Sequence, residues 1–336
     1  MKWMPTSVLN RTRNFLNRLW EEKLSRENNN IEAFYPHTPV LLETSVEFLI
    51  TDPSGIYVDA TLGGGGHSRA FLQALKGDAI LFGVDQDPEA HAAAAEKIGE
   101  DTRFKPITGN FGYLSTLISP EFHGKIAGVF FDLGVSTHQI REPGRGFSFQ
   151  HDGPLDMRMS DTSGTSAWEV VNNYDYEKLR DIIYHYGEER LSRQIAREII
   201  DRRPIETTLE LRKAIENVLY GRNIIKSVAR VFQAIRIEVN RELDVLKQGL
   251  SDALGLLKSG GRIVAISYHS LEDRIIKNFF KSGNFEGVVE KDFFGNPLKP
   301  IRVITKQIIT PSDEEINRNP AARSAKLRVA EKLMEE

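Results

Sequence analysis

The stretch that decides the fold runs Tyr57-Val58-Asp59-Ala60-Thr61-Leu62-Gly63-Gly64-Gly65-Gly66-His67-Ser68. It has the pattern of an apolar strand, a glycine loop and the first turn of a helix. Glycines let the backbone pass close beneath a ligand, and the start of a helix offers free amide donors. Asp85 closes the next apolar run, where an acid accepts hydrogen bonds from ribose hydroxyls. Together, the loop and the acid predict a site for a nucleoside cofactor.

This loop belongs to a longer alternation of strand-like and helical segments, which predicts a parallel sheet flanked by helices. The strand-like runs are 57–59, 79–84, 104–108, 126–131 and 261–267. Between about 142 and 225 the alternation stops, and helix-period segments at 176–200 and 208–220 replace it. We therefore predict an α/β, Rossmann-like core with a helical domain inserted after its fourth strand.

The predicted boundaries divide the chain into four segments. They are an N-terminal extension at 1–33, the first part of the core at 34–141, a helical insertion for substrate recognition at 142–225, and the second part of the core at 226–336. Apolar residues between Phe15 and Leu24 in the extension have helical spacing. That segment is either a helix that packs loosely on its own domain, a frayed tail, or an arm that contacts RNA or a partner, and its role stays open.

The composition is that of a folded protein, since 40% of its 336 residues are apolar and 27% are charged. With no cysteine, disulfides and thiolate zinc sites are excluded, and no His-Glu-x-x-His motif occurs, so we expect no metal. No apolar run approaches the roughly 18 residues of a spanning helix, and no secretory signal is visible. We therefore expect a cytoplasmic protein with no membrane association.

The net charge of -3 means that any nucleic-acid surface must be a local patch. Between residues 188 and 236, eleven basic residues face seven acids. The basic residues are Arg190, Arg193, Arg197, Arg202, Arg203, Arg212, Lys213, Arg222, Lys226, Arg230 and Arg236. This excess predicts a phosphate-contacting surface, although any single member is as well explained by an ion pair within a helix.

Further candidates for the cofactor site follow the third and fourth strands. Phe111 comes just after the third, where it either walls in an adenine or packs in the core. Asp132 ends the fourth strand, at the edge where open α/β sheets bind ligands. His67 leaves the glycine loop and is either a cofactor contact or a core histidine. Because the glycines are contiguous and lack the G-x-G-x-x-G spacing, they favour S-adenosylmethionine over NAD.

With these residues, the chain resembles the RsmH (MraW) family of bacterial 16S ribosomal RNA cytosine-N4 methyltransferases. The resemblance is continuous from about Tyr35 onward. Its motifs are 37–42 (His-Thr-Pro-Val-Leu-Leu), 65–68, 132–136, 145–149, 152–159, 186–189, 235–243 and 267–274. It implies a class I methyltransferase core and an S-adenosylmethionine site formed by Gly65, Gly66, His67, Asp85, Phe111, Asp132 and Gln139.

The resemblance also implies the reaction, which is methylation of the exocyclic N4 of a cytosine in the decoding region of 16S ribosomal RNA. It favours the assembled small subunit as substrate and leaves a homodimer as an open alternative. Asp132 is our candidate for the acceptor of an amine hydrogen, and binding of the cofactor is the alternative role. Many amine methyltransferases have Asp-Pro-Pro-aromatic here, whereas this chain has Asp132-Leu133-Gly134-Val135. Tyr268 and His269 are further candidates for contacting the base, by stacking and by hydrogen bonding.

Three other functions fit parts of the pattern. A nicotinamide-dependent oxidoreductase uses the same strand, loop and acid, but the glycine spacing disfavours it. A noncatalytic assembly factor with a decayed pocket is disfavoured because the loop and both acids are intact. A DNA methyltransferase differs in its methyl acceptor, so comparing DNA with ribosomal RNA distinguishes it.

Overall fold

The computed structural model describes residues 39–136, 139–140, 142–160, 164–219 and 223–334. The predicted N-terminal extension, its helix, and the first two residues of the motif at 37–42 lie outside the described residues. No helix in the described part of the chain is long and apolar enough to cross a bilayer.

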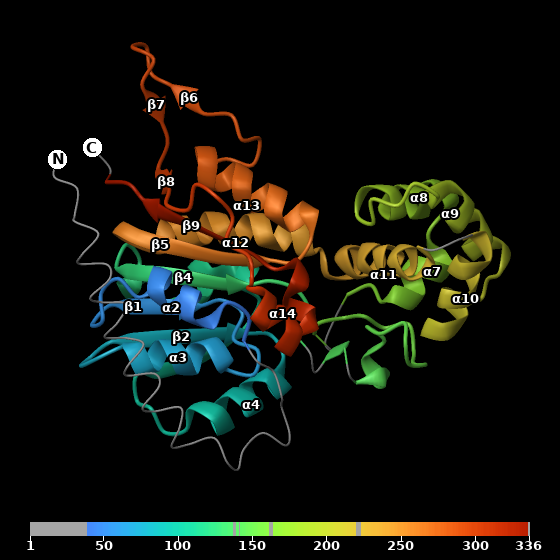
Figure 1. Cartoon of the computed structure of the whole chain (residues 1–336), viewed down its shortest axis with the longest axis horizontal. Helices are drawn as coiled ribbons and strands as arrows, with labels where there is room; N and C mark the ends of the chain where they lie inside the picture. The colour runs from blue at the N-terminus through green and yellow to red at the C-terminus, as the bar shows by residue number, and fades with distance from the viewer. Residues whose placement is uncertain (1–38, 137–138, 141, 161–163, 220–222, 335–336) are drawn as a thin grey trace. The chain divides into compact units, whose positions relative to one another are not determined.

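A seven-stranded sheet in the order β3-β2-β1-β4-β5-β9-β8 lies between the helices of the α/β core (Figure 1). Its strands are β1 (Ile56–Asp59), β2 (Ile80–Asp85), β3 (Phe104–Thr108), β4 (Ile126–Asp132), β5 (Leu257–Ser267), β8 (Ile301–Val303) and β9 (Lys326–Lys332). The first five pair in parallel, and β9 runs antiparallel to both β5 and β8. The order 3-2-1-4-5 is Rossmann-like, so the predicted α/β class is confirmed.

The fifth strand is longer than the sequence pattern predicted. It begins at Leu257, which pairs with Ile126, and the register then shifts so that Arg262 pairs with Gly128. The extra residues of the shift include Gly260, whose φ of 77° suits a bulge. Turn-forming residues at 259–261 therefore form an irregularity inside the strand and not its start.

Helices cover both faces of the sheet, as expected for parallel strands. Buried residues of α12 and α13 pack with Val129 and Phe131 of β4. On the other face, Phe130 packs edge-to-face on Phe71 of α3, with ring centroids 5.1 Å apart. The helices of this core are α2 (Leu42–Leu49), α3 (Gly66–Ala74), α4 (Pro88–Ile98), α5 (Leu114–Leu117), α12 (Glu242–Leu256), α13 (Ser270–Ser282) and α14 (Asp313–Arg318).

Helical chain replaces the alternation between β4 and β5, as predicted. Its helices are α7 (Ala167–Asn173), α8 (Tyr176–His185), α9 (Ser192–Asp201), α10 (Thr208–Val218) and α11 (Ile224–Asn240). They enclose a second core, separate from that of the sheet, which includes Val228, Val231 and Phe232 of α11. The predicted end of the insertion at 225 stays a prediction, and α11 supplies one wall of this second core.

Short elements complete the described chain. They are the 3-10 turns η1 (Phe111–Tyr113), η2 (Pro120–Phe122), η3 (Pro143–Arg145) and η4 (Pro320–Ser324), with β6 (Glu290–Lys291) and β7 (Pro297–Leu298). The last two pair antiparallel as a separate hairpin.

Candidate functional site

The glycine loop between β1 and α3 has a tightly packed part and an open part. A Cβ added at Gly66 would lie 2.5 Å from Cγ of Pro39, so no side chain fits there. One added at Gly63 would meet only the carbonyl oxygen of Thr61, at 4.0 Å. Gly65 precedes α3 with a φ of 74°. The loop therefore packs on its neighbours at its end and faces open space at Gly63.

We expect Gly65→Ala to lower the free energy of unfolding by about 3 kcal/mol, because a left-handed φ and an overpacked contact are both costly. Its Cβ would lie 2.9 Å from Cα of Ala94 in the backbone of α4. Gly77→Ala is the matched control, since Gly77 has a φ of 58° and open space around it. Urea unfolding at neutral pH compares the two, and equal losses would show that the contact with α4 contributes nothing.

Asp85 holds the loop in place from the end of β2. The Gly63 N–H donates to its Oδ2 at 2.9 Å, and the Asp87 N–H donates to its Oδ1 at 2.9 Å. Burial raises the pKa of Asp85, and these two hydrogen bonds partly offset that increase. Each carboxylate oxygen keeps a second lone pair, so Asp85 can still accept a ribose hydroxyl.

Asp132, at the end of β4, is held by side chains from two other elements. The Tyr268 hydroxyl donates to its Oδ1 at 2.8 Å, and His67 Nδ1 lies 3.6 Å from its Oδ2. His67 Nε2 lies 3.0 Å from the carbonyl oxygen of Val40, where it donates a proton. In the neutral imidazole Nδ1 is then the acceptor, and it faces Asp132. The hydroxyl of Tyr268 is thus bound to this carboxyl group, and stacking of its ring on a base stays a prediction.

Burial raises the pKa of Asp132 to about 7, and the nearby charges of Asp59 and Glu272 add to the shift, while the bond from Tyr268 opposes it. Burial likewise raises the pKa of Asp59 to about 6, although the Ser68 hydroxyl donates to it at 2.6 Å. Sequence reasoning assigned Asp59 no role. The signal was present, since Asp59 ends β1 as Asp85 and Asp132 end their strands.

Gln139 lies beside the turn that follows β2. Its Nε2 donates to Asp87 Oδ2 at 3.4 Å, and Arg145 Nη1 donates to the same oxygen at 3.4 Å. The Gln139 Oε1 accepts from the Ser136 N–H at 3.1 Å. The structure therefore brings Gln139 close to Asp85 through Asp87.

Phe111 is placed by the turn after β3. Asn110 Nδ2 donates to Gln86 Oε1 at 3.1 Å, which joins this turn to the one after β2. The Phe111 ring packs edge-to-face on Phe131, with centroids 5.7 Å apart, and against Gly249 of α12. Part of the ring thus belongs to the core, and its contact with adenine stays a prediction.

A buried charged cluster joins α11 and α12 to the start of α13. Arg236 Nε and Nη2 donate to the two oxygens of Glu242 at 2.7 and 2.9 Å. Glu272 accepts from the N–H groups of Tyr268 and His269, at 2.8 and 3.3 Å. One side-chain oxygen of Glu242, one of Glu272 and one ring nitrogen of His269 lie within 4.8 Å of one another. Arg236 supplies the positive charge that balances the carboxylate of Glu242. His269, predicted to contact the base, is part of this cluster.

Some basic residues of the insertion are engaged within the chain, and others are exposed. Arg203 donates to the carbonyl oxygens of Val171 and Tyr174 at 2.7 and 2.6 Å, so it stabilises the turn after α9. Ion pairs inside the chain engage Arg202, Arg212, Arg230 and Arg236. Exposed basic residues include Arg190, Arg193, Lys213 and Lys226, whereas Arg222 lies outside the described residues. The predicted basic surface is therefore smaller than the sequence count suggested.

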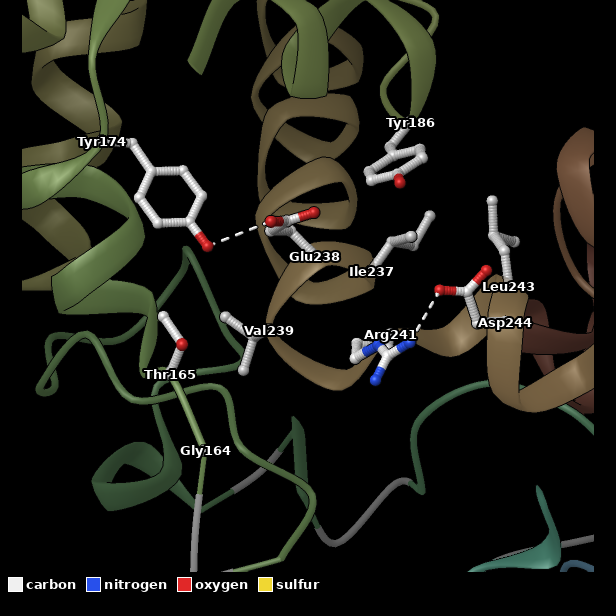
Figure 2. Close-up of a pocket in the computed structure, with 10 residues that line it drawn as sticks. All are labelled: Gly164, Thr165, Tyr174, Tyr186, Ile237, Glu238, Val239, Arg241, Leu243 and Asp244. Carbon is white, nitrogen blue, oxygen red and sulfur yellow. Dashed lines mark hydrogen bonds and ion pairs between the residues drawn. The ribbon is translucent and has the colours of Figure 1, made fainter. Parts of the chain in front are cut away.

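A cavity of about 410 Å³ lies at the junction of α11 and α12 (Figure 2). Its lining residues are Gly164, Thr165, Tyr174, Tyr186, Ile237, Glu238, Val239, Arg241, Leu243 and Asp244. The Tyr174 hydroxyl donates to Glu238 Oε1 at 3.0 Å, and Arg241 pairs with Asp244 at 3.3 Å. Sequence reasoning missed this cavity because its walls come from separate segments. Its main charged groups are paired with one another.

The strand ends gather three carboxyl groups. Asp59, Asp85 and Asp132 end three adjacent strands, and each has a raised pKa. A pyrophosphate would be repelled there, and the Gly63 N–H that would bind it already donates to Asp85. The site therefore favours a cationic nucleoside ligand over a dinucleotide.

Comparison with known proteins adds a family to this geometry. The model of the MraW methylase family matches residues 34–333. A protein of Parabacteroides distasonis named "Ribosomal RNA small subunit methyltransferase H" is 46% identical over 301 residues, which cover 88% of this chain and 97% of that protein. Proteins of the same name from Flavobacterium johnsoniae and Caldicellulosiruptor saccharolyticus are each 47% identical, covering 88% and 89% of this chain and 98% and 100% of theirs.

A solved structure, titled as a putative rRNA-methylase from Clostridium thermocellum, aligns with 87% of this chain and 94% of its own at 14% identity and a TM-score of 0.42, a likeness too weak to bear on function. The family model, by contrast, spans nearly all of the described chain, and the relatives match over almost their whole length. The chain belongs to the MraW methylase family.

Proposed function

We propose that this protein transfers a methyl group from S-adenosylmethionine to the exocyclic N4 of a cytosine in the decoding region of 16S ribosomal RNA. The observation that carries the proposal is Asp132, a buried carboxyl group at the ligand edge of the sheet with a pKa of about 7. Family membership supports methyl transfer, and the names of the relatives support small-subunit ribosomal RNA as the acceptor.

The residues at the strand ends fit S-adenosylmethionine. Its sulfonium is a cation, which the carboxyl groups of Asp59, Asp85 and Asp132 at the ends of three adjacent strands would attract in their ionised form. Asp85 has lone pairs for the ribose, and the space above Gly63 admits the ligand. When bound, this cofactor supplies an electrophilic methyl group. Gly65, Gly66, His67, Phe111 and Gln139 complete the proposed binding site.

Asp132 is proposed to accept an amine hydrogen of the cytosine. The amine is a poor nucleophile because its lone pair is delocalised into the ring, so an acceptor that removes a proton keeps electron density on nitrogen. Tyr268 fixes one oxygen of Asp132, and burial raises the pKa of the Tyr268 phenol well above its ordinary value, which keeps it a donor. His67 Nδ1 lies 3.6 Å from the other oxygen.

The helical insertion is proposed to recognise the RNA. Its exposed basic residues suit contact with phosphates, and recognition by shape suits a folded RNA. We infer that the acceptor is the assembled small subunit in the cytoplasm, where a preformed single-stranded site lowers the cost of extruding the base. In this account a noncatalytic assembly factor is disfavoured, because the acids of the site are buried and mutually arranged.

We expect kcat/KM to rise with pH and to reach half of its maximum near pH 7, because only ionised Asp132 accepts the proton and burial raises its pKa to about 7. Initial rates between pH 5.5 and 9 check this. Asp59→Asn serves as a comparison, since it removes a neighbouring charge that contributes to the raised pKa of Asp132 and should therefore move the inflection to lower pH. A flat profile between pH 6 and 8 would contradict the role of Asp132.

Calorimetric titration with S-adenosylhomocysteine and with NAD tests the cofactor. We expect the first to bind and the second to show no heat of binding, and the reverse result would support an oxidoreductase. Transfer of radiolabelled methyl groups to small ribosomal subunits that lack the modification, compared with double-stranded DNA, tests the acceptor. Transfer to DNA alone would overturn the assignment to RNA.

A further inference from the structure

We propose that the β6–β7 hairpin binds the RNA substrate by stacking the rings of Phe293 and Phe294 on unpaired bases. This inference rests on the proposed function, because it requires an RNA substrate. The hairpin extends beyond α13 and β8 (Figure 1). Its tip therefore defines a contact apart from the strand-end site.

The hairpin concentrates the exposed apolar side chains of the described chain. Among eleven large apolar residues exposed there, three lie on this hairpin, namely Phe293, Phe294 and Leu298, and Val288 lies two residues before it. Phe293 is 98% exposed and Phe294 is 85% exposed. Apolar surface of this kind, gathered at one place, marks an interaction site.

The two rings are held in place by a well-formed turn. Asp292 Oδ1 accepts from the N–H groups of Phe294 and Asn296, each at 2.8 Å, and its Oδ2 accepts from Asn296 Nδ2 at 2.8 Å. The Gly295 N–H donates to the Asp292 carbonyl oxygen at 3.0 Å. The bonds from Asn296 lower the pKa of Asp292, so its carboxylate is ionised and directed at the turn's own N–H groups. The turn thus presents both rings without needing a partner to order them.

The base of the hairpin is fixed to α13. Asn278 Nδ2 donates to the Phe285 carbonyl oxygen at 3.0 Å, and the Phe285 ring stacks on Phe279 with centroids 5.0 Å apart. Since α13 starts at Ser270, beside Tyr268, and rises about 1.5 Å per residue, the anchoring residues Asn278 and Phe279 lie roughly 12 to 14 Å along this helix from its start. Contact at the tip therefore adds to binding of the substrate and not to the chemistry.

Single-stranded RNA is the partner that these rings suit best. Every base has a π face, so two exposed aromatic rings bind it with little dependence on base sequence. Charge supports this partner, because residues 277–306 contain six lysines and arginines against three acids. One of those acids, Asp292, is engaged by the turn. An apolar socket on a protein is the competing partner.

Steady-state kinetics with small ribosomal subunits that lack the modification test the proposal. We expect the F293A/F294A variant to raise KM for the subunits by about fivefold or more, with kcat at saturation almost unchanged. F293L/F294L should show the same loss, because leucine is apolar but cannot stack, and F293W/F294W should restore binding. Met334→Ala, which truncates another exposed apolar side chain, should match the unaltered protein.

Two results would overturn the proposal. An unchanged KM in F293A/F294A would show that the tip does not contact the substrate. Full affinity in F293L/F294L would assign the tip to an apolar protein socket.

A second measurement separates this inference from the proposed function. If the protein transferred no methyl group to subunits, the proposed function would fail, and tryptophan emission of the F293W variant would then decide the hairpin's role. Quenching by a 12-nucleotide oligocytidylate, absent in a Met334→Trp variant, supports stacking. Emission unaffected by the oligonucleotide rejects it.

Discussion

Asp132→Asn is expected to lower kcat for methyl transfer by about 10²- to 10⁴-fold, the contribution typical of a positioned proton acceptor. Asparagine can accept the hydrogen bond from Tyr268 but cannot take a proton from the amine. Transfer to small subunits measures the rate, and calorimetry should show that S-adenosylhomocysteine still binds. Loss of cofactor binding, with the rate constant per bound cofactor unchanged, would instead assign Asp132 to the cofactor.

The same substitution is expected to stabilise the fold, and more so at higher pH. The pKa of Asp132 is about 7 in the folded chain and near 4 when unfolded, so ionisation of the buried group weakens the fold as the pH rises through this window. This loss of unfolding free energy through ionisation of Asp132 is absent below pH 4 and complete above pH 7, where it reaches about 4 kcal/mol at most. Thermal unfolding at pH 5 and pH 8 measures it, and an advantage of the Asn variant that shrinks with pH would contradict the shift.

Arg236→Met is expected to lower the free energy of unfolding by about 3 kcal/mol, because breaking a buried ion pair leaves its partner uncompensated. The side chains of Arg236 and Glu242 are only 15% and 10% exposed. Without the guanidinium, Glu242 would face Glu272 within the same cluster. Urea denaturation measures the loss.

A double-mutant cycle isolates this pair. Replacing both partners, as Arg236→Met with Glu242→Leu, removes the buried charges together and should recover most of the lost stability. A double variant as unstable as Arg236→Met alone would show that the loss comes from packing of the arginine side chain. Arg241→Met, which breaks an exposed pair with Asp244, is the control and should cost less than about 1 kcal/mol.

The strand ends were the most predictable part of this molecule. Apolar runs, glycine placement and closing acids located β1, β2, β3 and β4 to within a residue. Strands β1, β2 and β4 are largely buried and appear as nearly continuous apolar runs, whereas β3, at the edge of the sheet, is partly exposed. The positions of Asp85 and Asp132 at the sheet edge followed directly from these predicted strand ends. The predicted start of β5 was wrong, since a bulge and a turn have the same glycine-rich composition.

Long-range pairings were beyond local patterns. That Tyr268 donates to Asp132 depends on β4 and β5 being neighbours with a particular register, although 136 residues separate the two side chains. The role of Glu272, by contrast, could have been predicted from local sequence, although the resemblance only placed this residue in a motif. Its side chain caps the start of α13 by accepting from the Tyr268 and His269 N–H groups, which is what a His-x-x-Glu spacing before an apolar run predicts.

The central claim is that the strand-end site methylates a cytosine amine in small-subunit ribosomal RNA. Nucleoside mass spectrometry, after incubation of unmodified small subunits with S-adenosylmethionine carrying a heavy methyl group, tests it most directly. We expect N4-methylcytidine with the heavy label in the decoding region, and its loss with Asp132→Asn. A heavy methyl group on C5 or on a ribose oxygen, or undiminished labelling by the Asp132→Asn variant, would contradict it.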